Sequence, residues 1–186
     1  MISVIDVEAS GFGFDSYPIE VGVVTHSNQR LCFLIYPFSD WNHWDDNAES
    51  VHTISRHVLL DRGKHPVEVC GELNLLLRDT TVYSDAWVHD YDWINKLFYR
   101  AKIKMEFRVS PIESVATEEQ LIAWDATKKL VIDQLGLVRH RASSDALIIQ
   151  KTFHETALIE QSSIVDTRIV DTRIVDTPIV TTPASF

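Results

Sequence analysis

Two acidic residues stand one residue apart near the start of the chain, where an apolar segment gives way to glycines. Asp6 and Glu8 lie at the end of the apolar residues 2–7, and glycines follow at positions 11 and 13. Alternate residues of a strand point to the same face, so both carboxylates project side by side from a buried element. Two like charges that close are unfavourable unless a cation is shared between them. The pattern therefore favours a site for a pair of divalent metal ions.

Two further stretches carry residues suited to such a site. Residues 83–93 hold Asp85, Asp90 and Asp92 after a short apolar segment. Acids near a helix start often only cap the helix, but three acids in this span indicate another role for at least one. The sequence favours Asp90 and leaves Asp92 open. His140 and Asp145 stand between two expected helices. The alternatives to a functional role are an exposed histidine and an acid in a first helical turn.

The elements that must position these residues begin with an antiparallel meander. Apolar runs predict strands over residues 2–7, 18–25 and 31–36, with short connections rich in Gly, Ser, Asn and Asp. The first connection is too short for the helical crossover that parallel neighbours require.

Helices then alternate with strands. Helical periodicity predicts helices over residues 66–77, 90–101, 117–136 and 144–160, and short strands are expected over 81–84 and 107–114. Pro66 suits a first helical turn, and Thr117 and Gln120 form a capping box. The order predicts an α/β fold, a mixed sheet flanked by helices.

The charge and composition exclude several classes of protein. The net charge of −10 argues against broad binding of duplex nucleic acid, because proteins that coat DNA neutralise phosphates with a basic surface. No apolar run reaches the ~18 residues of a membrane-spanning helix. Only two cysteines occur, which is typical of a cytoplasmic protein. Residues 1–161 are expected to form one domain, and the repeated Ile-Val-Asp-Thr pentapeptides of residues 162–186 a low-complexity tail, flexible or extended, because a period of five matches neither helix nor strand.

Three motifs in this order resemble the DEDDh branch of the 3′–5′ exonucleases, which includes proofreading exonucleases, ribonuclease T and oligoribonuclease. Asp6-Val-Glu-Ala-Ser-Gly11 matches the family's opening motif, Asp-x-Glu-(Thr/Ala)-(Thr/Ser)-Gly, throughout. His140-Arg-Ala-Ser-Ser-Asp145-Ala146 matches the third motif, His-x-Ala-x-x-Asp-Ala, completely. Residues 84–94 resemble the middle motif with one extra residue before Asp90. The resemblance covers residues 2 to about 158 and implies a ribonuclease H-like fold.

The resemblance implies a two-metal site for phosphodiester hydrolysis. Two Mg²⁺ ions, or Mn²⁺ in their place, would be held with Asp6 bridging both. Glu8 and Asp145 would serve the ion that carries the nucleophilic water, and Asp90 the second ion. His140 would take the proton from the attacking water, since an imidazole accepts protons at neutral pH.

The expected substrate is the 3′ end of a single-stranded nucleic acid, with RNA favoured over DNA because the chain is a small acidic domain with no part that grips a duplex. Backbone N–H groups after Glu8 and nearby aromatic rings are expected to hold the strand end. These substrate-binding candidates are Ala9, Ser10, Gly11, Phe12 and Trp87. The resemblance also implies a homodimer.

Two other functions fit parts of the pattern. A haloacid-dehalogenase-type phosphatase also opens with a strand and two acids one residue apart, but it needs Asp in place of Glu8 and a helical crossover after the first strand. A non-catalytic nucleic-acid-binding module of the same fold would not need His140 as a base.

Overall fold

The five strands form one mixed sheet in the order β3-β2-β1-β4-β5. β1 (Ser3–Ala9), β2 (Pro18–Val24) and β3 (Arg30–Leu34) make the antiparallel meander expected from the sequence. β4 (Thr81–Ser84) pairs with β1 in parallel, and β5 (Arg108–Pro111) pairs with β4 in parallel. The computed structural model describes the backbone of residues 1–174 and the side chains of residues 1–159. The antiparallel pairing of β1 with β2 rules out the helical crossover that the phosphatase alternative requires.

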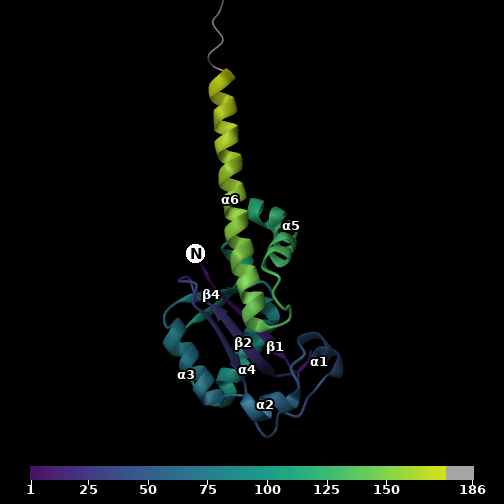
Figure 1. Ribbon diagram of the computed structural model, residues 1–186. Coiled ribbons are helices and arrows are strands. Elements are labelled where there is room, and N and C mark those ends of the chain that lie inside the picture. The colour runs from purple at the N-terminus through teal and green to yellow at the C-terminus, as the bar shows by residue number, and fades with distance from the viewer. Residues whose placement is uncertain (175–186) are drawn as a thin grey trace, which may run out of the picture.

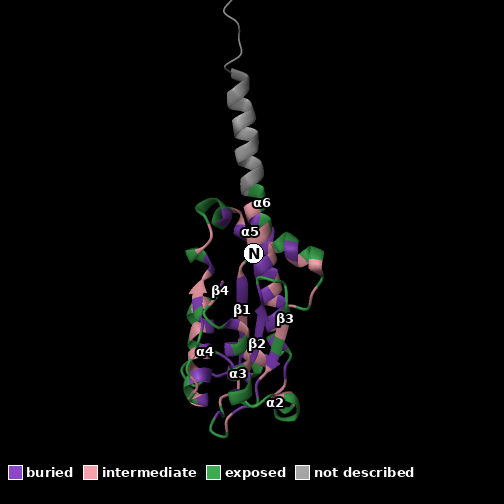
Figure 2. Cartoon of the chain, turned by 90° about the vertical axis from the view of Figure 1, so that its left-hand side faces the viewer, coloured by how far each residue is buried: buried purple, intermediate pink, exposed green. Residues whose placement is uncertain are grey.

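Helices cover both faces of the sheet and bury its central strands (Figures 1 and 2). α3 (Pro66–Leu77) and α4 (Trp87–Ala101) pack on one face over a core that includes Ile5, Ile19 and Leu73. α5 (Glu118–Leu135) and α6 (Ala142–Ile174) pack on the other face, where Val4, Trp124 and Ile149 meet. Side chains alternate across a strand, which is why neighbouring residues of β1 belong to different cores. The predicted α/β architecture is confirmed.

Helix boundaries follow local capping chemistry. α5 begins at the predicted capping box, in which Thr117 Oγ1 accepts from the Gln120 N–H at 3.2 Å and Gln120 Oε1 accepts from the Thr117 N–H at 3.1 Å. The helix ends at Gly136, whose φ of 55° is a left-handed conformation that glycine adopts without strain. α4 begins at Trp87, earlier than expected, and the last part of the expected strand 107–114 is the 3₁₀ turn Ile112–Ser114.

Two short helices between β3 and α3 were not predicted. α1 (Asp46–His52) and α2 (Arg56–Arg62) each span seven residues, too few for a helical period to stand out in the sequence. Side chains cap both: Asp45 accepts from the Asn47 N–H at 2.8 Å, and Ser55 from the Val58 N–H at 3.4 Å. α1 becomes important because it forms a wall of the candidate site.

α6 is longer than the expected helix over 144–160. Its backbone continues to Ile174 and so includes the first part of the segment expected to be a flexible or extended tail (Figure 1). Residues 175–186 lie outside the described residues, and the domain boundary at residue 161 stays a prediction. In the described part of the chain, no helix combines the length and apolar character needed to cross a membrane.

Candidate active site

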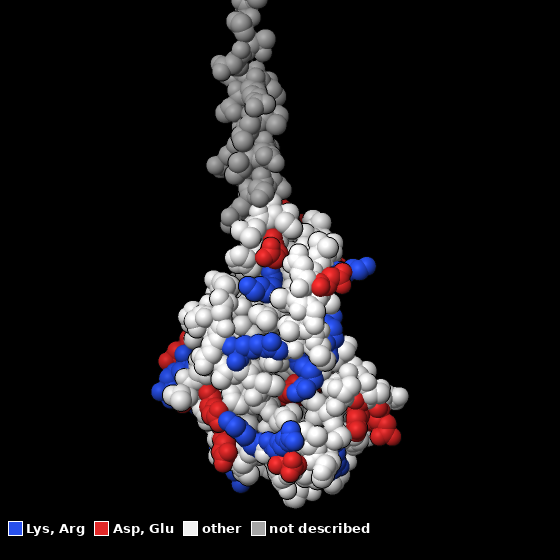
Figure 3. All heavy atoms as spheres, viewed as in Figure 1, with Lys and Arg blue, Asp and Glu red and all other residues white. Residues whose placement is uncertain are grey.

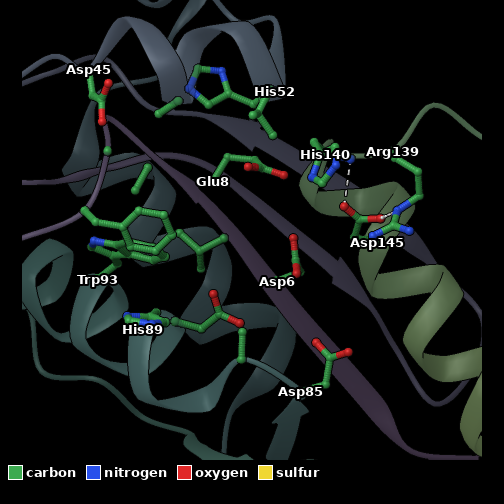
Figure 4. A pocket seen from close by; sticks show the side chains of 18 of the residues that line it. Asp6, Glu8, Asp45, His52, Asp85, His89, Trp93, Arg139, His140 and Asp145 are labelled. Atoms are coloured by element: carbon green, nitrogen blue, oxygen red, sulfur yellow. Dashed lines mark hydrogen bonds and ion pairs between the residues drawn. The ribbon is translucent and has the colours of Figure 1, made fainter. Parts of the chain in front are cut away.

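The two carboxylates of β1 lie at the centre of the sheet. Asp6 pairs in register with Gly22 of β2, and Glu8 pairs with Glu20. Both side chains are half-buried and line a cavity of about 460 Å³ between β1 and the first turns of α4 and α6. Figure 4 shows Asp6 and Glu8 pointing into the same space. The two-residue spacing therefore places both acids together, as predicted.

Asp90 brings a third carboxylate from the first turn of α4. Its side chain is only 1% exposed, and it lines the same cavity. Ser84, the last residue of β4, donates its hydroxyl to Asp90 Oδ2 at 2.5 Å and accepts from the Ala86 N–H at 3.0 Å. Asp92 instead lines a neighbouring groove. The structure thus brings Asp90, and not Asp92, to Asp6 and Glu8.

Asp145 and His140 complete the group from the start of α6. Asp145 Oδ1 accepts from Arg139 Nε at 2.7 Å, and its Oδ2 accepts from the backbone N–H of His140 at 2.8 Å (Figure 4). His140 has a left-handed φ of 59° and lies exposed at the rim. One potential ligand atom each from Glu8, His140 and Asp145 lies within 4.8 Å of the others.

The start of α6 is held against β2 by a glycine and a buried ion pair. A Cβ on Gly22 would lie 2.1 Å from the Ala142 carbonyl carbon, so only glycine allows this approach. Glu20 is fully buried, and it accepts from Arg141 Nη2 at 2.5 Å and from the Ala142 N–H at 2.8 Å. These contacts fix where the first turn of α6 presents Asp145.

The carboxylate group is electrostatically unfavourable without added cations. Burial and the charges of Asp90, Glu8, Asp145 and Asp85 raise the pKa of Asp6 well above its ordinary value. Burial raises the pKa of Glu8 to about 7, and the charge of Asp145 adds to this effect.

The third acid follows the same pattern. Burial is also the main reason that the pKa of Asp90 rises to about 7, although the Ser84 hydrogen bond lowers it. Within the described residues, no Lys or Arg forms an ion pair with Asp6, Glu8 or Asp90. The group has the composition of a site for hard divalent cations, which prefer carboxylate oxygens.

Basic side chains surround this acidic centre. Arg139 and Lys128 line the cavity, and Lys128 forms an ion pair with Asp85. Arg30 reaches the start of α6, where its Nη2 donates to Ser144 Oγ at 2.8 Å. Figure 3 shows Lys and Arg side chains around a hollow at the base of α6. The net negative charge of the chain is therefore not spread evenly, and cations flank the carboxylates.

Three of the five predicted substrate-binding residues line the cavity: Ala9, Gly11 and Phe12. Ser10 does not, because it is buried and its hydroxyl bonds to His43 Nδ1 at 3.0 Å and accepts from the Tyr17 N–H at 3.1 Å. It joins the loop before α1 to the end of β1, and a further hydrogen bond of 2.9 Å runs from the Asp45 N–H to the Ser10 carbonyl.

Trp87 also lies outside the cavity. Its indole Nε1 donates to the Val109 carbonyl at 3.0 Å, and its ring stacks on Tyr91 with centroids 5.4 Å apart. Trp87, a substrate-binding candidate from the sequence, therefore lies apart from the cavity residues: its ring packs against the core cluster beside β5.

Several cavity residues were missed by sequence reasoning. Asp45, Asn47 and His52 line the cavity from α1 and its N-cap, and His89 and Trp93 line it from α4. His89 and Trp93 are four residues apart and therefore share one helix face, with rings stacked 5.7 Å apart. That spacing was a signal available in the sequence. The residues of α1 offered none, since the helix itself was not predicted.

Comparison with known proteins identifies the fold. No protein-family model and no curated protein sequence matches the chain. Solved structures of E. coli exonuclease I do match: a complex with a 5cy-dT13 oligonucleotide has a TM-score of 0.61 and 13% identity over 81% of this chain and 39% of that chain. The zinc-bound form with single-stranded DNA has a TM-score of 0.62 and 13% identity over 89% of this chain and 42% of that chain. A dT13 complex has a TM-score of 0.60 and 12% identity over 92% of this chain and 43% of that chain.

The chain spans about two fifths of the length of the exonuclease I chains that it matches. At this sequence identity the likeness concerns the fold and carries no residue assignment. The chain has the mixed α/β fold found in exonuclease I.

Proposed function

We propose that the protein is a metal-dependent 3′–5′ exonuclease that removes nucleoside 5′-monophosphates from single-stranded nucleic acid. The observation that carries the proposal is the convergence of Asp6, Glu8, Asp90 and Asp145 beside His140 in one cavity. Such a group of acids is costly unless cations bind there, and a general base beside it serves hydrolysis. The 3′ direction follows from the resemblance of the three motifs to DEDDh exonucleases.

The donor set fits divalent metal ions. Asp6, Glu8, Asp90 and Asp145 would hold two Mg²⁺ or Mn²⁺ ions. Bound there, two ions would supply a Lewis-acid clamp and an acidified water. The raised pKa values of Glu8 and Asp90, both about 7, mean that binding is accompanied by loss of protons from these groups near neutral pH.

His140 accepts the proton of the attacking water in this proposal. Its ring lies beside Glu8 and Asp145 at the rim, where water has access. The backbone hydrogen bond from His140 to Asp145 and the left-handed φ of His140 hold the ring at this edge. Arg139 donates to the other carboxylate oxygen of Asp145, which holds Asp145 in position beside His140.

The strand end would enter beside the turn that follows β1. Ala9, Gly11 and Phe12 line that part of the cavity, and α1 forms the facing wall with Val51 and His52. Phe12 is 69% exposed and available to contact a base, for which stacking contributes roughly 1–3 kcal/mol.

The preference for RNA over DNA stays a prediction, as do the homodimer and the cytoplasmic location. The exonuclease I structures hold DNA oligonucleotides, so both nucleic acids belong in the test. The experiment digests single-stranded RNA, single-stranded DNA and duplexes, each with a free or a blocked 3′ end, with Mg²⁺ or Mn²⁺ and with chelator.

We expect release of nucleoside 5′-monophosphates from single strands with free 3′ ends, and no release in chelator. Asp90→Asn should abolish the reaction, whereas Asp133→Asn, at an exposed position of α5, should not. Release that persists in chelator, or equal cleavage of strands with blocked 3′ ends, would overturn the proposal.

A further inference from the structure

Large aromatic side chains are exposed along one side of the molecule next to the candidate site. Phe14 is 94% exposed, Tyr99 82% and Phe12 69%. Exposed apolar surface that is contiguous commonly marks an interaction site. Together with neighbouring side chains of α4 they form what we call the aromatic track, made of Phe12, Phe14, His89, Trp93, Lys96 and Tyr99.

The track is continuous with the carboxylate cavity. Phe12, His89 and Trp93 line both the cavity and a second groove of about 460 Å³. Phe14 and Lys96 line that second groove and a third of about 550 Å³, which Tyr99 also lines. Figure 4 shows His89 and Trp93 on α4, across the cavity from His140. A molecule that leaves the cavity on the α4 side therefore meets the track directly.

The rings near the cavity hold one another in place. Phe12 meets His89 edge to face at 5.3 Å, and it lies 6.0 Å from Trp93. Trp93 Nε1 donates to Ser16 Oγ at 3.0 Å, which ties α4 to the loop that carries both phenylalanines. These contacts pack Phe12, His89 and Trp93 together at the end of the track nearest the cavity, which lowers the entropy cost of binding there.

Lys96 anchors the middle of the track. Its ammonium donates to the Phe14 carbonyl at 2.6 Å and to the Ser16 carbonyl, and it lies 5.7 Å from the centroid of the Phe14 ring. The Phe14 ring thus stands beside Lys96 of α4 with nearly all of its surface exposed. An aromatic ring beside a cation suits a nucleobase with its phosphate.

The charges along the track indicate whether it suits a duplex or a single strand. Lys96 has Asp15 and Asp92 nearby, and Arg100 forms a bidentate pair with Asp40 at 2.7 Å. The surface is therefore not strongly basic, and it does not suit a duplex held through its phosphates. Exposed rings do suit unpaired bases, whose faces are free to stack.

We infer that the aromatic track binds the nucleotides upstream of the 3′ terminus, so that a single strand runs from the carboxylates along α4 towards Tyr99. The inference rests on the proposed function. From His89 to Tyr99 the helix rises about 15 Å. At roughly 3.4 Å per stacked base this length accommodates about four nucleotides.

The test compares two substrates of different length. A dinucleotide fills the cavity alone, whereas a 12-nucleotide single strand also extends over the track. The measured quantity is the ratio of kcat/KM for the 12-mer to kcat/KM for the dinucleotide. We expect Phe14→Ala and Tyr99→Ala each to lower this ratio by about 5- to 100-fold, because stacking is lost only for the longer substrate. Phe14→Trp should restore it.

Leu75→Ala is the matched control, because Leu75 is 79% exposed on α3, away from the track. It should keep the wild-type ratio. Circular dichroism verifies that each variant is folded. The KM of the 12-mer should also depend only weakly on salt, as expected when stacking rather than phosphate neutralisation provides the affinity.

The two proposals fail in different ways. If neither substrate is hydrolysed by the wild-type protein, the proposed function fails. If the dinucleotide is hydrolysed but Phe14→Ala and Tyr99→Ala keep the wild-type ratio, the track does not bind the strand and the inference is overturned. A ratio that falls in Leu75→Ala as strongly as in the track variants would also overturn it.

Discussion

Glu8 and Glu20 are cross-strand neighbours with opposite surroundings. Both belong to the central pair β1 and β2, and they lie opposite one another in register. Glu20 is fully buried but accepts hydrogen bonds from Arg141 and from the Ala142 N–H. Within the described residues Glu8 forms no ion pair with a Lys or Arg, and burial beside Asp145 raises its pKa to about 7. A buried carboxylate with its partner supplied by the chain is structural, while one without a partner calls for a cation from solution.

The comparison extends to the whole site. Asp6 and Asp90 share the situation of Glu8, because burial and then neighbouring acids raise their pKa values, and neither forms an ion pair with a Lys or Arg of the described residues. In the proposed account, the stability of the fold depends on Glu20 of β2, whereas metal binding depends on Asp6 and Glu8 of β1 and Asp90 of α4. Each of the following variants changes either the carboxylates of the candidate site or the contacts that hold the start of α6 against β2.

Asp6→Asn should have the largest effect. The amide removes the central negative charge of the metal site, so nucleotide release should fall to the level seen in chelator. The same change should stabilise the metal-free protein at pH 8, since it removes a carboxylate whose pKa is raised by burial and by repulsion from neighbouring acids. Chemical denaturation in chelator measures the second effect; a destabilised variant would contradict the electrostatic account.

His140→Ala should lower kcat by about 10²- to 10⁴-fold, the usual range for loss of a general base. Metal uptake should persist, because the four carboxylates remain. His57→Ala, at an exposed position of α2, is the control. Full activity of His140→Ala would show that another group takes the proton.

Arg141→Met tests the structural acid. Without the guanidinium, Glu20 is left buried and unpaired, which typically costs about 3–5 kcal/mol of the free energy of unfolding. Arg78→Met breaks the exposed pair with Glu106, whose N–O distance is 2.7 Å, and should cost less than about 1 kcal/mol. Equal losses in denaturant titrations would remove the distinction between the two kinds of carboxylate.

Gly22→Ala tests how β2 positions the start of α6. The added Cβ overlaps the Ala142 backbone, so unfolding should become easier by about 1–3 kcal/mol or more, and kcat should fall as Asp145 moves. Gly71→Ala in α3 meets no atom within 4 Å and should stabilise the protein by up to about 1 kcal/mol through helix propensity. One denaturation series measures both changes in the free energy of unfolding, which we expect to have opposite signs. A Gly22→Ala protein with unchanged stability and rate would contradict this role of β2.

The sequence predicted what local periodicity and short motifs determine. The apolar run of residues 2–7 was enough to predict a buried strand whose end presents Asp6 and Glu8 on one face. The span from His140 to Asp145 places a loop histidine and a first-turn acid on the same helix start. Pairing of β1 with β2 followed from the short connection between them. These features depend on neighbours in the chain, so the sequence contains them.

The features that the sequence did not predict depend on tertiary contacts. Ser10 belongs to a matching motif, yet its hydroxyl is used by His43 and by the Tyr17 backbone, which a motif does not reveal. Trp87 stands near Asp90 in sequence but points to β5. The partnership of Glu20 with Arg141 joins residues far apart in the chain, so no local pattern predicts it.

Titration calorimetry of metal binding, with a nucleoside 5′-monophosphate present, tests the central claim most directly. Wild-type protein should take up Mn²⁺ or Mg²⁺ more tightly at pH 8 than at pH 6, with proton release, because Glu8 and Asp90 have pKa values of about 7. In chelator the folded state holds more protons than the unfolded chain between about pH 5 and pH 7, so the free energy of unfolding should fall as pH rises through that window. Asp6→Asn should bind metal much more weakly. Absence of metal uptake by the wild-type protein at pH 8 would contradict the account.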